Sequence, residues 1–182
     1  MIEAWRLKGY ELEPWRVAYH EAGHALMAVL IRRGFQYVTI ESALGGSFPG
    51  HTKTTFTRVN DLDFLRENTN QLWNIPSLLC WKEACLLLAG PCSEIAAMNE
   101  TEPVHHGDWD IQKARLYINL LARGDQEVAQ SVADNITLEI HQALQDNWRT
   151  LEEIVSALLD QETMSARQVR EIVKSRKYLH PG

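Results

Sequence analysis

Residues 17–30 read Val17-Ala-Tyr-His-Glu-Ala-Gly-His-Ala-Leu-Met-Ala-Val-Leu30, and this stretch decides how the chain folds. Its apolar residues recur at helical spacing on most sides, so we expect a central, buried helix that can begin at Pro14. His20 and His24 lie four residues apart and therefore share one face of that helix. Burying them together with Glu21 is costly unless they have a partner. We interpret that partner as a metal ion, with Glu21 beside the water on it.

A catalytic zinc site also needs a third protein ligand and an open position. The polar segment Thr101-Glu-Pro-Val-His-His-Gly-Asp-Trp-Asp110 offers four candidates, which are His105, His106, Asp108 and Asp110. Asp108 has an equally good structural role as the N-cap of a helix that runs to about Leu121. Residue type alone does not choose among the four.

Glu94 is a further candidate. It follows Gly90-Pro91, where we expect a kink or a break in a largely buried helix over Ser77–Asn99, and its neighbours are apolar. A carboxylate in such company needs a partner, so Glu94 is either the third ligand or a residue that orients a ligating histidine. A half-exposed helix glutamate is the alternative.

Two strands are expected after the first helix, which should end near Arg33 with Gly34 as its stop. Phe35–Ser42 alternates between apolar and polar residues. His51–Val59 is rich in threonine, which is typical of an exposed edge strand. Such an edge, at residues 51–57, could bind an extended peptide by β-augmentation, or it could be a solvated hairpin.

The rest of the chain is predicted to be helical. An amphipathic pattern runs from Asp125 to Trp148. Capping-box patterns at Thr150 and at Ser165 begin two further helices. No linker divides the 182 residues, so we expect one domain, with a metal-site core at residues 14–124 and C-terminal helices at 125–182.

Composition excludes several classes of protein. The net charge of −6 argues against a nucleic-acid partner. The longest apolar runs are too short to span a bilayer, and the first residues lack the apolar core of a signal peptide, so we expect a cytoplasmic protein. The three cysteines fall in one predicted helix without paired spacing, as small core residues do.

Four segments, in this order, resemble the peptidase domain of the FtsH-type AAA zinc proteases. They are Tyr19-His-Glu-Ala-Gly-His-Ala-Leu26, Leu88-Ala-Gly-Pro-Cys-Ser-Glu94, Gly107-Asp-Trp-Asp-Ile-Gln-Lys-Ala114 and Leu158-Leu-Asp-Gln-Glu-Thr-Met-Ser165. The resemblance covers residues 17–173. The first segment is the most specific, and Asp108-Trp109 departs from the family's Ser-Asn.

The resemblance implies an α+β, mainly α fold, a helical zincin-like peptidase domain with a small sheet beside the His-Glu-x-x-His helix. It implies Zn²⁺ held by His20, His24 and Asp110, with Glu21 as the catalytic carboxylate. It gives Glu94 a supporting role near the site. It also implies that the edge of the sheet receives the substrate.

The expected function is therefore that of a zinc metalloendopeptidase. The chain has no Gly-x-x-x-x-Gly-Lys-Ser/Thr loop, so we expect ATP-independent cleavage of peptides or flexible segments, unless a separate ATPase partner supplies the motor. The partners considered are such an ATPase or a second copy of the chain in a homo-oligomer. The alternative is a zinc-stabilised binding or regulatory module that does not cleave. A zinc deaminase is excluded because Ile95 stands where its second cysteine is required.

Overall fold

The computed structural model describes residues 14–41, 50–54, 77–99 and 106–174, with the backbone alone at 54 and 106–108. These residues form the helices α2 (Pro14–Leu30), α5 (Ser77–Met98), α6 (His106–Leu121), α7 (Gln126–Asp146), α8 (Trp148–Gln161) and α9 (Ala166–Lys174). The strands are β1 (Phe35–Thr39), β2 (His51–Thr54) and β3 (Thr163–Ser165). The fold is mainly helical with one small antiparallel sheet, which confirms the predicted α+β, mainly α class.

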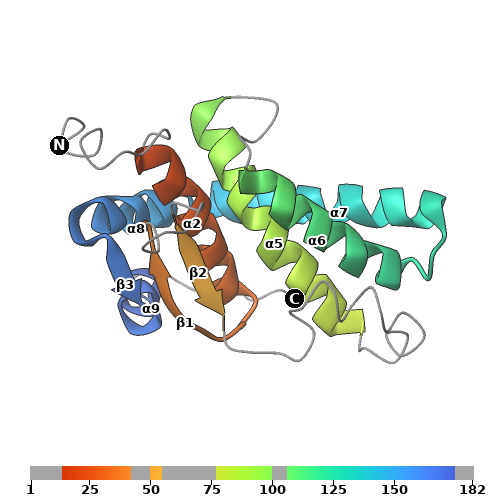
Figure 1. Cartoon of the computed structure of the whole chain (residues 1–182), viewed down its shortest axis with the longest axis horizontal. Helices are drawn as coiled ribbons and strands as arrows, with labels where there is room; N and C mark the ends of the chain where they lie inside the picture. The colour runs from red at the N-terminus through yellow and green to blue at the C-terminus, as the bar shows by residue number, and fades with distance from the viewer. Residues whose placement is uncertain (1–13, 42–49, 55–76, 100–105, 175–182) are drawn as a thin grey trace.

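Helix α2 is the centre of the fold. It lies between the sheet and the α5–α6 pair, and α8 and α9 also pack against it (Figure 1). Every residue from Val17 to Val29 except Tyr19 is buried, as the apolar pattern predicts. Gly23 marks the crossing with α5, because a Cβ there would lie 2.5 Å from the Ala89 carbonyl oxygen and 2.6 Å from Ser93 Cβ. A larger residue at this position would force the two helices apart.

The end of α2 differs from the prediction. The helix ends at Leu30 rather than near Arg33, and its stop is Arg32, with φ 54, rather than Gly34. The Arg33 amide donates to the Ala28 carbonyl at 2.7 Å and the Arg32 amide donates to Val29 at 3.1 Å. These two bonds form a Schellman motif, which satisfies the last carbonyls of the helix even with a non-glycine residue at positive φ.

Of the kink or break expected at Gly90-Pro91, the break is wrong. Helix α5 continues from Ser77 to Met98 with Pro91 inside it. Proline lacks the amide that would bond to the preceding turn, so the surrounding packing rather than the local hydrogen bond maintains the helix there. Within the described part of the chain, no helix combines the length and apolar character needed to cross a membrane.

The sheet has the order β2-β1-β3, and both pairs of strands are antiparallel. The two predicted strands are confirmed over 35–39 and 51–54, and β2 lies at an edge as expected; residues 55–59 lie outside the described residues. Strand β3 was not predicted. Its Met164 pairs with Val38, and both side chains are fully buried. The segment assigned wholly to C-terminal helices therefore contributes a strand that completes the sheet.

The predicted starting points of the C-terminal helices are confirmed in part. The Asp125 side chain accepts from the amides of Glu127 and Val128 and begins α7. Ser165 and Gln168 form the predicted capping box at α9. The pattern at Thr150 is wrong, because α8 already begins at Trp148.

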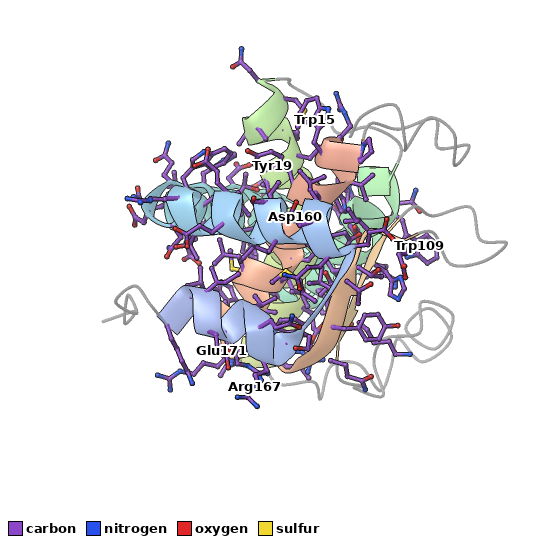
Figure 2. All side chains as sticks on the ribbon, turned by 90° about the vertical axis from the view of Figure 1, so that its left-hand side faces the viewer. Trp15, Tyr19, Trp109, Asp160, Arg167 and Glu171 are labelled. Atoms are coloured by element: carbon purple, nitrogen blue, oxygen red, sulfur yellow. The ribbon has the colours of Figure 1, made fainter. Side chains whose placement is uncertain are left out.

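The outer surface of α9 is charged, in contrast to its buried face. Arg167 and Glu171, one turn apart, lie on that outer surface (Figure 2) and form an ion pair at 2.9 Å. Ala166, Val169 and Val173 are buried on the opposite side. This division lets α9 cover α2 and the sheet while its other face stays in water.

The three cysteines should be unreactive in the folded protein. Cys80, Cys85 and Cys92 are free and buried on α5. Burial raises the pKa of Cys85 to about 12 and that of Cys92 to about 11, and it also raises the pKa of Cys80. Because the thiolate is the reactive form, we expect no labelling by a thiol reagent at pH 8 and labelling of all three after unfolding. A native thiol that reacts as fast as in the unfolded chain would contradict this packing.

Candidate metal centre

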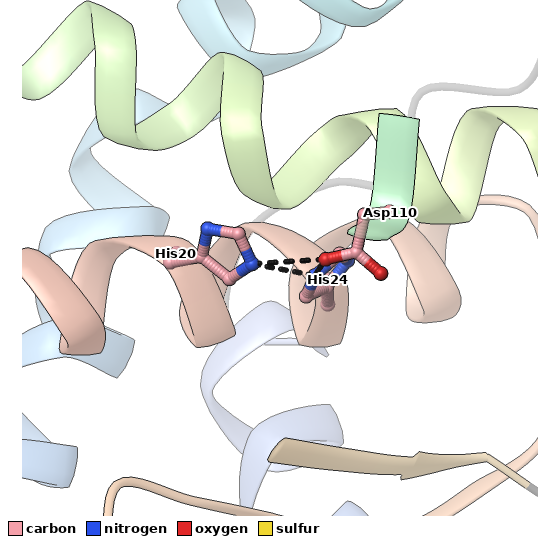
Figure 3. A group of neighbouring side chains, drawn as sticks. All are labelled: His20, His24 and Asp110. Atoms are coloured by element: carbon pink, nitrogen blue, oxygen red, sulfur yellow. Dashed lines mark hydrogen bonds and ion pairs between the residues drawn. The ribbon is translucent and has the colours of Figure 1, made fainter. Parts of the chain in front are cut away.

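His20 and His24 of α2 and Asp110 of α6 converge on one point (Figure 3). The Nε2 atoms of the two histidines are 3.1 Å apart. Asp110 Oδ2 lies 3.1 Å from Nε2 of His20 and 3.2 Å from Nε2 of His24. Asp110 follows His20 by 90 residues and His24 by 86 residues, yet the three donor atoms form a nearly equilateral triangle.

The other ring nitrogens determine the protonation of both histidines. His20 Nδ1 lies 3.1 Å from Glu94 Oε2, and His24 Nδ1 lies 2.7 Å from the Leu86 carbonyl oxygen. Both partners accept hydrogen bonds, so each Nδ1 carries the proton, and in a neutral imidazole the Nε2 atom then presents a lone pair. Two such lone pairs and a carboxylate oxygen therefore face one another, an arrangement that a metal ion or an added proton would stabilise.

The triangle fits a metal ion. Zinc binds nitrogen and carboxylate oxygen at about 2.0–2.1 Å, so tetrahedral ligands stand about 3.3 Å apart. The observed separations of 3.1–3.2 Å are close to this value. A small divalent ion could hence contact all three atoms from one side of their plane and keep a fourth position open. The residues present hence suit the ion that the sequence predicts.

The charges around the triangle also favour a divalent cation. Glu21, Glu94 and Asp110 supply three carboxylates, whereas Arg16 supplies a guanidinium, which pairs with Glu94 at 3.0 Å. With neutral histidines, these side chains carry two net negative charges in a mostly buried setting. Buried charge is costly unless it is neutralised, and a divalent ion would neutralise this group.

The pKa values of His20 and Asp110 also indicate that this site favours a positive charge. Burial by itself lowers the pKa of His20, but the hydrogen bonds to Asp110 and Glu94 outweigh it and raise the pKa to about 10. For Asp110, burial acts to raise the pKa, yet His24 and His20 hold it well below its usual range. Without a metal ion, a proton on His20 takes the place of the cation.

Glu94 and Arg16 extend the site by one further layer. Glu94 is buried on α5, where it bonds to Nδ1 of His20 through one oxygen and to Arg16 through the other. A carboxylate on the outer nitrogen of a ligating histidine fixes the ring and makes it a stronger donor. Of the two roles considered for Glu94, the geometry favours orienting His20 over direct ligation.

The His24 ring depends on the absence of a side chain at Gly90. A Cβ at Gly90 would overlap Nε2, Cε1 and Cδ2 of His24. The Leu86 carbonyl that accepts from His24 lies one turn before Gly90 on the same helix. Helix α5 therefore provides both the space for this imidazole and the acceptor that sets its tautomer.

Glu21 is held between α2 and strand β2. Thr52 Oγ1 donates to Glu21 Oε2 at 2.9 Å and also lies 3.2 Å from the Glu21 carbonyl oxygen. Burial raises the pKa of Glu21, against the lowering effects of His24, His20 and the Thr52 hydrogen bond. A carboxylate whose pKa is raised in this way is suited to accept and return a proton.

The other predicted site residues have different outcomes. Helix α6 begins at His106, so Asp108 lies within its first turn and is not the N-cap. His105 lies outside the described residues, as do the side chains of His106 and Asp108. Trp109, next to Asp110, is 48% exposed at the outside of the molecule (Figure 2).

Four contributors to the site were missed by sequence reasoning, and they are Arg16, Thr52, Leu86 and Gly90. Arg16 could have been found, because it lies one turn before His20 on the same helix. Thr52 could have been found from strand alternation, which places it on the face opposite to His51 and Lys53. The Leu86 carbonyl and the space at Gly90 leave no signal in residue type.

No protein-family model matches the chain, and no curated protein matches its sequence. The resemblance to FtsH-type peptidase domains therefore stays a prediction.

Replacing Gly90 by alanine should weaken metal binding. The new Cβ occupies the position of the His24 ring, which must move away from His20 and Asp110. We expect the affinity for Zn²⁺ to fall by about 10–100-fold, as for other residues that orient ligands. Competition with a zinc chelator measures it.

Gly124→Ala is the matched control. It strains a positive φ of 83° but meets nothing within 4 Å, so it should leave zinc affinity unchanged. Equal affinities for Gly90→Ala and the wild type would contradict the assigned position of His24.

Asp110→Asn should also weaken zinc binding, and more than Asp108→Asn does. Asparagine preserves the shape of Asp110 but removes the negative charge that faces both Nε2 atoms. Isothermal titration with Zn²⁺ compares the two variants. The reverse order of affinities would refute Asp110 as the third ligand.

Proposed function

We propose that the protein is a zinc metallopeptidase that hydrolyses peptide bonds in peptides or flexible protein segments. One observation carries the proposal. The buried Glu21 directly follows His20, one of the three residues whose donor atoms converge, and the Thr52 hydroxyl donates to one oxygen of its carboxylate. Such a group is the acid–base partner that a hydrolytic metal site needs.

In the proposed hydrolysis, different residues bind the metal ion, transfer the proton and orient the ligands. His20, His24 and Asp110 would hold the ion, which when bound supplies a Lewis acid that lowers the pKa of water and polarises the scissile carbonyl. Glu21 takes a proton from the attacking water and returns it to the leaving amine. Arg16 and Glu94 keep the His20 ring in its ligating orientation.

The substrate would bind at the sheet. Strand β2 forms an edge of the sheet, and its Thr52 bonds to Glu21. An extended peptide added along this edge would therefore lie next to the proposed base, as in recognition by β-augmentation. This arrangement, with a small sheet beside the metal-binding helix, agrees with the zincin-like fold and the FtsH-type peptidase family that the sequence resembles.

A second function is favoured by a different observation. The three donor atoms come from two helices, α2 and α6, so a metal ion would tie these helices together without any catalysis. Metal binding contributes directly to folding where the site does not exist in the unfolded chain. A zinc-stabilised binding or regulatory module is therefore the alternative.

Zinc analysis and a cleavage assay separate the two functions. We expect the purified protein to contain zinc and to cleave an unfolded protein substrate. Glu21→Gln should retain the metal, because Glu21 is not among the three donors. It should lower the cleavage rate by about 10²–10⁴-fold, the usual contribution of a general base.

The control is the zinc content of Glu21→Gln, which must equal that of the wild type for the loss to report on chemistry. Zinc bound by the wild type without turnover of a broad peptide library would reject the peptidase in favour of the module.

A further inference from the structure

Strand β2 presents Thr52 to α2. Thr52 pairs with Val38 of β1, so the two side chains lie on the same face of the sheet, and Val38 is fully buried there. The neighbours of Thr52 along the strand, His51 and Lys53, are exposed on the other face. His51 bonds there to the Tyr37 hydroxyl at 2.9 Å. Of residues 51–53, Thr52 is thus the one that the pleat directs toward Glu21.

The contact with Glu21 is close on two sides. Thr52 Oγ1 reaches Oε2 of the carboxylate at 2.9 Å. A Cβ at Gly50 would lie only 3.0 Å from Glu21 Cγ and 2.8 Å from Val17 Cγ1. The chain therefore passes over the glutamate stem without a side chain at residue 50 and holds the carboxylate with a hydroxyl at residue 52. A glutamate has several rotatable bonds, and these contacts restrict them.

The two oxygens of Glu21 differ in their surroundings. Thr52 donates to Oε2, and no residue within the described ranges donates to Oε1. One oxygen of the carboxylate is thereby fixed by the Thr52 hydroxyl, which leaves the other oxygen for a bond to water.

We propose that Thr52 is a positioning residue, whose hydroxyl holds the Glu21 carboxylate so that Oε1 meets the attacking water. This inference rests on the proposed function and assigns a role that the His-Glu-x-x-His motif does not contain. Because threonine is branched at Cβ, its hydroxyl has few available positions on a strand, which makes it a rigid donor. Strand β2 also forms the edge at which we propose that the peptide binds, so one strand would position both the substrate and the base.

Steady-state kinetics on zinc-loaded protein test this role. Thr52→Val preserves the shape and removes the hydroxyl, so kcat should fall about tenfold or more while KM changes less than about twofold, because misplacing a base affects the chemical step. Thr52→Ser keeps the hydroxyl and should retain most of kcat. Thr163→Val removes a hydroxyl from the far edge of the sheet, where it bonds to Thr39 at 2.6 Å, and should equal the wild type.

Three kinetic results would overturn the role. The first is a wild-type kcat in Thr52→Val, the second is equal impairment in Thr52→Ser, and the third is a rise in KM alone, which would place Thr52 in substrate binding. Zinc content and circular dichroism verify that each variant is folded. Thr52→Ala replaces the valine variant if that one does not fold.

A double-mutant cycle tests the hydrogen bond without an activity assay. Unfolding midpoints are measured for the wild type, Thr52→Val, Glu21→Ala and the double variant. We expect the double variant to lose less than the sum of the two single losses, because both changes break one bond. Additive losses would show that the bond contributes nothing and would overturn the proposal.

The cycle also separates the two levels of inference. Suppose that the wild type binds zinc and does not cleave, but the cycle shows the coupling. This result would reject the peptidase function and the positioning role of Thr52 in hydrolysis, and it would confirm the bond between Thr52 and Glu21. If the wild type cleaves peptides but the cycle shows no coupling, the peptidase function is retained and the positioning role of Thr52 is rejected.

Discussion

Two imidazole lone pairs and a carboxylate oxygen within 3.1–3.2 Å of one another are the constraint on which the rest of this structure depends. Left alone, these atoms repel each other, and no rearrangement of hydrogens relieves the repulsion while both Nδ1 protons are engaged by Glu94 and Leu86. Only an added positive charge does so. The fold thus holds these atoms in an arrangement that a metal ion would stabilise and that, without a metal ion, a proton on His20 stabilises.

Much of the surrounding packing brings these atoms together. Gly23 lets α2 and α5 approach closely, and Gly90 leaves room for the His24 ring. Arg16 and Glu94 connect the two helices through His20. The helices on one side of α2 thereby position the proposed metal ligands, and the sheet on its other side positions the proposed base through Thr52. The proposed ligation and the proposed proton transfer would thus be supported by separate layers, and α2 contributes residues to both.

Sequence reasoning predicted the parts of this arrangement that follow from local periodicity. The burial of α2, the pairing of His20 with His24 on one face, the edge position of β2 and the cap at Ser165 were all readable from residue spacing. The choice of Asp110 came from a resemblance, since residue type alone left four candidates. The structure does bring Asp110 to the two histidines.

What could not be predicted depends on contacts between distant segments. Strand β3 is only three residues long, too short for a period to appear, and its formation is determined by Val38 across the sheet. Helix α2 stops at Arg32 in spite of the preference for glycine at positive φ. The two backbone hydrogen bonds of its Schellman motif offset the cost of that backbone conformation. The proton positions on both histidines follow from a carbonyl and a carboxylate that are 62 and 74 residues away.

The position of β3 has a consequence for how the protein is made. Strand β1 leaves the ribosome well before the strand that pairs with its second side, because the Thr39–Thr163 bond spans 124 positions. Until then the nascent chain carries an apolar helix whose cover is incomplete and a strand with an open edge, which are features that promote aggregation. Synthesis thus has to reach α8 and α9 before α2 has all of its packing partners.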